Sequence, residues 1–313
     1  MTGETIKSKT LLILFITWAL GVQLLFCGNA FPARFESFPS RDAIVLVPPG
    51  MEGAAREVLS VFPAVKEEVE NFFNWPLNSV TTVMITEGRR LYKERAASNL
   101  VVGYAVPNRH LIVIFYSRTR ASPANLRVTI KHELCHLMLH EHVKAVRIPR
   151  WFDEGISQVV SGVAGEILNL EGDSLMRLAR RAGGLIGFRF LTDSFPDRHS
   201  ALLLAYAESK EFVGYIIRHF GKQGIRAILQ AMKEGASIDN ALFQVTGLKL
   251  HELEARWRKS IEKRDTWLAR LSYYLYEILF ALAALVSIYI FVRQYRAKKA
   301  YHDMDDEDFL GED

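Results

Sequence analysis

The sequence has only two cysteines in 313 residues, so a framework of disulfide bonds is excluded as the source of its stability. Cys27 lies in an apolar run near the N-terminus and Cys135 lies among histidines, so a disulfide between them is not expected. The net charge is +4, and its dispersed basic residues give no argument for a nucleic-acid partner. The chain has no internal repeat and no long linker. Half of its residues are hydrophobic, enough for one sizeable domain or two small ones.

Histidine, by contrast, is concentrated in one short stretch. Residues 131–142 read KHELCHLMLHEH and contain the pattern His-Glu-x-x-His at His132, Glu133 and His136. Residues four apart on a helix lie on the same face with Cβ atoms about 5–6 Å apart, so both imidazoles can reach one ion. A catalytic zinc site uses three protein ligands and keeps a fourth position for water. The two histidines therefore require a third ligand.

The residues around this motif predict a helix. Ser122 and Pro123 form a helix start signal, an N-cap residue followed by proline at the first helical position, and Pro149 prevents the helix from continuing further. Between them, apolar residues recur at spacings of three and four, as in an amphipathic helix: Leu126, Ile130, Leu134, Leu137 and Met138. A histidine-rich helix whose polar face meets solvent is the alternative interpretation of the same pattern.

Two residues compete as the third ligand. His142 stands where a metzincin pattern places its last histidine, but that pattern needs a turn-making glycine where this chain has Leu139. Leucine favours continuation of the helix, which directs His142 away from the other two histidines. Glu154, at the start of a second predicted helix in IPRWFDEGISQVVSG, is the favoured candidate. Its neighbour Asp153 is interpreted as either an acidic residue of the first helical turn or a carboxylate that orients a ligating imidazole.

The combination of H-E-x-x-H with P-x-W-F-x-E-G at residues 149–155 resembles the gluzincin metallopeptidases, particularly the peptidase MA-like group. The resemblance extends from about Val45 to about Ile261. Its downstream part is similar to the helical half of that family, with a tyrosine-bearing helix, a Phe-Gly stop, a short helix, a Thr-Gly turn and a tryptophan-bearing helix. It implies an α+β, zincin-like domain with a small sheet, an active-site helix and a helical C-terminal half.

The resemblance also implies roles for individual residues. His132, His136 and Glu154 correspond to the ligands of Zn²⁺, and Glu133 to the general base. Tyr206 occupies a place that supplies a tyrosine near the substrate oxyanion in related enzymes, although Tyr215 lies on the same predicted helix. Zinc would polarise the scissile carbonyl and acidify water, Glu133 would take the proton of that water, and a phenol would stabilise the oxyanion.

Coarse patterning places these motifs in one α+β domain. Residues rich in β-branched side chains predict strands at 43–48, 79–85, 100–105 and 111–116, with a turn at residues 107–109 between the last two. Helices are expected at 52–74 and 88–97 and throughout the chain after residue 123.

The two ends of the chain predict its location. Residues 1–30 carry Lys7 and Lys9 before an apolar run and end at Ala30, as in a signal peptide, although the run could equally remain as an anchor. Residues 271–292 are long and apolar enough to span a bilayer. Basic residues follow directly, which predicts a cytoplasmic acidic tail at 293–313 and an extracytoplasmic, periplasmic domain at 31–265 anchored in the inner membrane.

These patterns predict a membrane-anchored zinc metallopeptidase that acts on peptide or protein substrates. The alternative is a non-catalytic scaffold of the cell envelope that keeps the metallopeptidase fold to bind a partner. A third possibility, an intramembrane protease, requires an apolar span around the histidine motif. Lys131, His140, Glu141 and His142 exclude such a span.

Overall fold

The computed structural model describes residues 35–87, 102–119, 123–162 and 166–309. The predicted signal segment 1–30, the predicted helix 88–97 and the capping residue Ser122 lie outside these ranges. The chain divides into two compact units, Met1–Gly247 and Leu248–Asp313. Each unit is described separately below.

The first unit contains a five-stranded sheet with the order β1-β2-β3-β5-β4. The strands β2, β3 and β5 run parallel, whereas β1 and β4 pair antiparallel with β2 and β5 at the two edges. Their bounds are β1 (Glu36–Pro39), β2 (Ala43–Val47), β3 (Thr81–Thr86), β4 (Gly103–Val106) and β5 (Leu111–Phe115). The last two are joined by a 3-10 turn, η2 (Pro107–Arg109), at the position of the predicted turn.

The four predicted strands are confirmed as β2, β3, β4 and β5. The residues of β4 are all half-buried, whereas the other three strands contain buried side chains. In β2, for example, Ala43, Val45 and Val47 are buried and alternate with half-exposed residues, as expected where one face of a sheet is covered. The edge strand β1 was not predicted. It has only four residues, none of them buried, and its Ser37 and Pro39 carry little strand signal.

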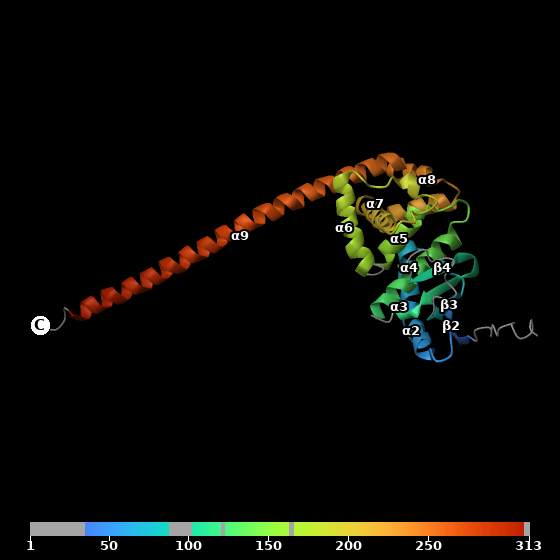
Figure 1. The fold of residues 1–313 in the computed structure, drawn as a ribbon, viewed down its shortest axis with the longest axis horizontal. Helices are drawn as coiled ribbons and strands as arrows, with labels where there is room; N and C mark the ends of the chain where they lie inside the picture. Colours follow the sequence, from blue (N-terminus) through green and yellow to red (C-terminus); the bar gives the residue numbers. More distant parts are fainter. Residues whose placement is uncertain (1–34, 88–101, 120–122, 163–165, 310–313) are drawn as a thin grey trace, which may run out of the picture. The chain divides into compact units, whose positions relative to one another are not determined.

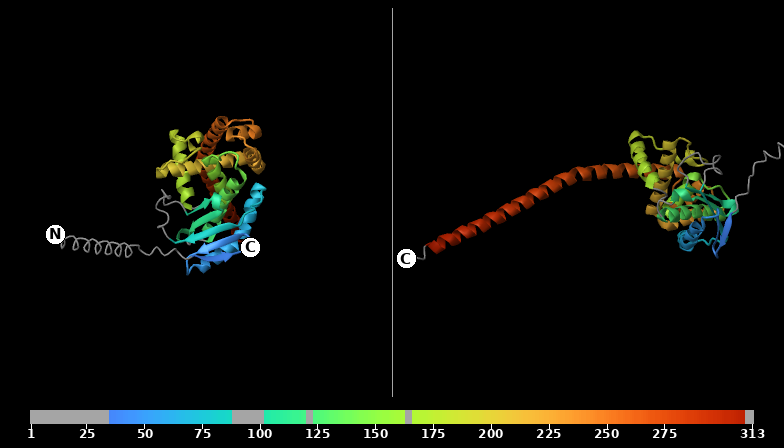
Figure 2. Two further views of the ribbon diagram at one scale, coloured as in Figure 1. Left: turned by 90° about the vertical axis from the view of Figure 1, so that its right-hand side faces the viewer. Right: turned by 60° about the horizontal axis from the view of Figure 1, so that its bottom comes forward.

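The helix α4 (Pro123–His142) contains the histidine motif and lies between the sheet and the helical half of the unit. It contacts β4 and α2 (Glu52–Phe73) on one side and α5 (Arg150–Ser161) on the other. Figures 1 and 2 show the strands and α2 at one end of this unit, and α6 (Glu166–Ala182) and α7 (His199–Lys233) at the other. The helix was predicted to be amphipathic, but Cys135 and Leu139 are also fully buried, because neighbours cover α4 on both sides.

The helical half follows the predicted layout. The kink at Gly221, where φ is +70°, divides the long helix α7 directly after Phe220. The short helix α8 (Ile238–Thr246) ends at Thr246 and has Gly247 as its C-cap. These are the predicted Phe-Gly stop and Thr-Gly turn. The remaining elements are α3 (Tyr116–Thr119) and η3 (Phe188–Leu191).

The second unit consists of one long helix, α9 (Leu250–Phe309). This helix contains Trp257 and is therefore the tryptophan-bearing helix predicted from the sequence. Within it, Tyr274–Arg296 forms a stretch of 23 residues with a mean hydropathy of 2.3, and none of this stretch is buried. By length and composition it can cross a membrane, and in the described part of the chain it is the one helix that meets both criteria. The predicted apolar span is therefore present as a helix.

Candidate metal centre

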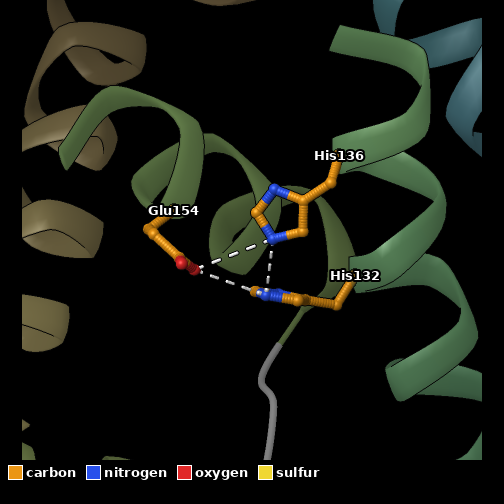
Figure 3. Close-up of side chains that lie close together, drawn as sticks. All are labelled: His132, His136 and Glu154. Carbon is orange, nitrogen blue, oxygen red and sulfur yellow. Dashed lines mark hydrogen bonds and ion pairs between the residues drawn. The ribbon is translucent and has the colours of Figure 1, made fainter. Parts of the chain in front are cut away.

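Three side chains converge between α4 and α5. His132 and His136 project from successive turns of α4 toward Glu154 in the first turns of α5 (Figure 3). One donor atom from each lies within 4.8 Å of the donor atoms of the other two. The two Nε2 atoms are 3.2 Å apart, and Glu154 Oε2 lies 3.6 Å from His132 Nε2 and 3.7 Å from His136 Nε2.

These distances fit a tetrahedral zinc site. Two donors that each lie about 2.1 Å from a zinc ion at the tetrahedral angle are about 3.4 Å apart. The three observed separations lie on both sides of that value. Two imidazoles and one carboxylate are also the donor set of many catalytic zinc sites, which leave one position open. The geometry and the donor chemistry therefore agree on the same ion.

Asp153 fixes the orientation of one imidazole. Its Oδ1 accepts a hydrogen bond from His136 Nδ1 at 2.7 Å, and its Oδ2 lies 2.9 Å from His140 Nε2. With the proton on Nδ1, His136 Nε2 is free to face Glu154 and His132. Of the two interpretations of Asp153, the structure therefore supports the carboxylate that orients an imidazole.

The electrostatics of this cluster favour a cation. Burial lowers the pKa of His136, but the charge of Asp153 and its hydrogen bond outweigh burial and raise this pKa to about 10. Burial alone would raise the carboxyl pKa values of Asp153 and Glu154, yet both are lowered by the neighbouring histidines. Both carboxyl groups are thus held in their charged form, which is the form that binds a divalent ion, and a bound ion would take the place of the proton on an imidazole nitrogen.

Glu133 lies beside the cluster without belonging to it. Its side chain is buried, only 6% of its surface is exposed, and burial raises the pKa of its carboxyl against the opposing effect of His132 and His136. The carboxylate also accepts a hydrogen bond from the backbone N–H of Ala105 in the edge strand β4. A carboxylate with a raised pKa next to an ion site is suited to accept a proton from water.

Tyr206, on α7, faces the same cluster. The charge of Glu154 is the largest cause that raises the pKa of the Tyr206 hydroxyl, followed by burial, and Glu133 contributes as well. The ring of Tyr206 packs edge-to-face on Phe195, with centroids 5.0 Å apart. Tyr215 is also buried, but its ring packs on His219 at a centroid distance of 4.1 Å. Tyr206 is therefore within electrostatic reach of the candidate ligand Glu154.

His142 lies elsewhere. Its ring stacks on Trp75 with centroids 4.7 Å apart, and its Nε2 is 2.8 Å from the carbonyl oxygen of Pro76. His142 is the last residue of α4 and is directed away from the other two histidines, as expected, and it contacts the loop before β3. The helix continues through Leu139 to His142, as the missing glycine predicted.

Two residues near the cluster were not singled out from the sequence. His140 stands one turn beyond His136, and the spacing of four could have indicated that it shares a face with the first two histidines. Arg150 begins α5, and its Nε lies 3.9 Å from Glu154 Oε1. The spacing of four residues between Arg150 and Glu154 could have indicated this contact, because both lie on the same helix.

A zincin-type arrangement of two histidines and a glutamate, carried by adjacent helices beside a small sheet, is thus defined by the fold. The family model described as the Peptidase MA superfamily matches residues 97–263, more than half of the chain. The chain belongs to the Peptidase MA superfamily. The family and the α+β, zincin-like fold class predicted from the sequence are confirmed.

Solved structures with partial similarity include native yeast LTA4 hydrolase, at 14% identity and a TM-score of 0.45, covering 71% of this chain and 38% of that chain. Legionella pneumophila aminopeptidase A in complex with aspartic acid matches at 14% identity and a TM-score of 0.41, covering 72% of this chain and 27% of that chain. The chain therefore spans well under half of the length of these proteins. No curated protein sequence matches the chain.

Proposed function

We propose that this protein is a membrane-anchored zinc metallopeptidase that hydrolyses peptide bonds. The observation that carries the proposal is the convergence of His132, His136 and Glu154 at separations suited to one zinc ion, with the buried carboxylate of Glu133 beside them. Membership of the Peptidase MA superfamily supports the same class of reaction.

In this proposal the chain supplies distinct groups to one reaction. Zn²⁺ held by the three ligands would polarise the scissile carbonyl and acidify the attacking water. Glu133 takes the proton of that water and delivers it to the leaving amine. The Tyr206 hydroxyl donates a hydrogen bond to the oxyanion that develops on the carbonyl oxygen. Asp153 keeps the His136 ring oriented throughout.

The location of the enzyme forms part of the proposal. The helix Tyr274–Arg296 anchors the chain in the inner membrane, residues 31–265 lie in the periplasm and residues 293–313 face the cytoplasm. The apolar character of this helix and the basic residues at its C-terminal end, including Arg293 and Arg296, support this orientation. The segment 1–30 directs export.

The substitution Glu133→Gln tests the reaction. The purified, detergent-solubilised full chain should retain its fold and about one zinc ion, while hydrolysis of a mixed peptide library falls by about 10²–10⁴-fold, because only the proton acceptor is lost. Zinc content, circular dichroism and mass-spectrometric detection of cleaved peptides provide the three measurements. Cleavage by the variant at the wild-type rate would refute the assigned role.

The competing function is a non-catalytic scaffold of the cell envelope. That model expects no cleavage by the wild type and an unchanged cellular phenotype when Glu133→Gln replaces the natural gene at equal expression. The convergence of His132, His136 and Glu154, with Glu133 and Tyr206 in electrostatic reach of them, favours the enzyme.

A further inference from the structure

Arg150 lies beside the candidate centre, on the same helix as Glu154. It is the first residue of α5, and its backbone N–H donates to the carbonyl oxygen of Thr192 at 2.8 Å. The guanidinium lies over the ring of Phe195, with 5.0 Å between Cζ and the centroid. Stacking on a buried ring restricts the plane of the guanidinium, so its N–H groups have defined directions.

The two carboxylate oxygens of Glu154 face different partners. Oε2 faces His132 and His136 at 3.6 Å and 3.7 Å, whereas Oε1 faces Arg150 Nε at 3.9 Å. The pair is shielded on the carboxylate side, where only 13% of the Glu154 side chain is exposed, and more open at Arg150, where 44% is exposed. A positive charge beside Oε1 favours a carboxylate that directs only Oε2 toward the ion.

Arg150 is also linked to Tyr206. Phe195, under the guanidinium, packs edge-to-face on the Tyr206 ring at 5.0 Å, and Arg150 interacts with the hydroxyl of Tyr206 through its charge and a hydrogen bond. Gln158 joins the same two helices by donating to the carbonyl oxygens of Glu154 at 3.3 Å and Tyr206 at 3.2 Å. Arg150 therefore touches both the third candidate ligand and the candidate oxyanion donor.

We propose that Arg150 is a positioning residue that holds Glu154 to a single ion-facing oxygen and holds the Tyr206 hydroxyl beside the centre. Both effects act on the fourth coordination position of the proposed ion, where the attacking water would lie. A carboxylate that used both oxygens would occupy the space that the attacking water needs, and a free phenol would lose its direction toward the oxyanion. This inference rests on the proposed zinc site and adds to it a residue outside the motif.

The test compares Arg150→Met and Arg150→Lys with the control Arg147→Met in the detergent-solubilised full chain. Methionine keeps an unbranched apolar side chain over Phe195 but removes the charge, and lysine keeps the charge without the planar fork. Arg147 has a side chain that is 71% exposed and pairs with Asp193, so its loss should leave the centre unchanged. The probe is Co²⁺ substituted for zinc, whose visible absorption is stronger with four ligands than with five.

We expect Arg150→Met to bind one metal ion but to show weaker Co²⁺ absorption than the wild type, as a second carboxylate oxygen joins the ion. Its turnover should fall about 10–100-fold, the range for residues that orient ligands, with a smaller change in KM. Arg150→Lys should recover part of the absorption, and Arg147→Met should match the wild type in both measurements.

The inference is overturned if both Arg150 variants match Arg147→Met in absorption and turnover. If Arg150→Met does not fold, Arg150→Lys decides: wild-type absorption together with wild-type turnover would overturn the role. A wild-type chain that binds Co²⁺ but cleaves no peptide would refute the proposed function while the absorption comparison still tests Arg150. A wild-type chain that binds no metal would refute both.

Discussion

At the scale of single residues, side chains that are close in the sequence make different contacts at the candidate centre. His132, His136 and His140 share one face of α4, yet His140 contacts Asp153 at 2.9 Å and lies outside the group of three possible ligands. Of the two adjacent carboxylates on α5, Asp153 contacts the Nδ1 atom of His136. Glu154 instead faces the Nε2 atoms of both His132 and His136. Neighbouring carboxylates therefore have different chemistry.

The identity of the third ligand gives a direct prediction. Glu154→Gln should lower zinc content well below one ion per chain, because the carboxylate that faces both Nε2 atoms is replaced by a neutral amide. His142→Ala should retain zinc, since its ring stacks on Trp75 and lies away from the cluster. Metal analysis after dialysis against a mild chelator measures both. Loss of zinc from His142→Ala alone would contradict the gluzincin arrangement.

The hydroxyl of Tyr206 gives a second prediction. Tyr206→Phe should reduce kcat more than it changes KM, because the phenol is proposed to bind the oxyanion only in the transition state. A loss of about 10²–10³-fold is the range for removal of one oxyanion donor. The matched control is Tyr215→Phe on the same helix, with its ring on His219, which should keep most of its activity. Equal losses in the two variants would argue for a structural effect of α7.

At the scale of elements, the position of α5 depends on a glycine. A Cβ on Gly155 would lie 2.5 Å from the carbonyl oxygen of Ser209 and 2.6 Å from Val213 Cγ2, both on α7. The lack of a side chain at Gly155 thus permits the close approach of α5 to α7. Close contact between α5 and α7 places Glu154 and Tyr206 on the same side of the centre.

Gly155→Ala should therefore destabilise the protein by about 1–3 kcal/mol, the range for overpacking in a well-packed interior. It should also weaken zinc binding, because α5 must move away from α7 and carries Glu154 with it. The control is Gly53→Ala in the first turn of α2, where an added Cβ meets nothing within 4 Å and the change should not destabilise the protein. Urea unfolding measures both. Equal stability of the two variants would contradict the proposed packing constraint.

At the scale of the whole molecule, one chain combines a domain that carries a candidate metal centre with a helix suited to cross a membrane. The described residues of Tyr274–Arg296 are all exposed, including Tyr276, Phe280 and Phe291, as expected for side chains that would face lipid. The acidic tail that follows is helical through Phe309, so the helix extends beyond the apolar stretch.

The proposed topology predicts the outcome of a protease-protection experiment. A tag inserted near the exposed Gly183 should be digested by added protease only after any outer barrier is opened, whereas a tag at Asp313 should remain protected in intact cells. The control is a cytoplasmic protein that stays intact in the same samples. Digestion of the Asp313 tag with protection of the Gly183 tag would reverse the orientation and the compartment.

The sequence by itself determined the strands of the sheet's interior, the helical motif of α4 and the spacing of His132 and His136, because these depend on periodicity over a few residues. It also determined that α4 continues past Leu139, since leucine does not form the turn that a glycine makes. These features follow from backbone geometry, and neighbouring elements do not change them.

Only the tertiary structure decided how α5 lies against α4 and α7. That packing aligns Glu154 with two histidines that precede it by 18 and 22 residues, turns Asp153 toward His136, and brings Tyr206 to the carboxylate that Arg150 faces within α5. The burial of α4 on both sides likewise results from the packing of neighbouring elements against it. Contacts between separate helices depend on side-chain volumes and on close approach at positions such as Gly155, and these quantities have no local signature in the sequence.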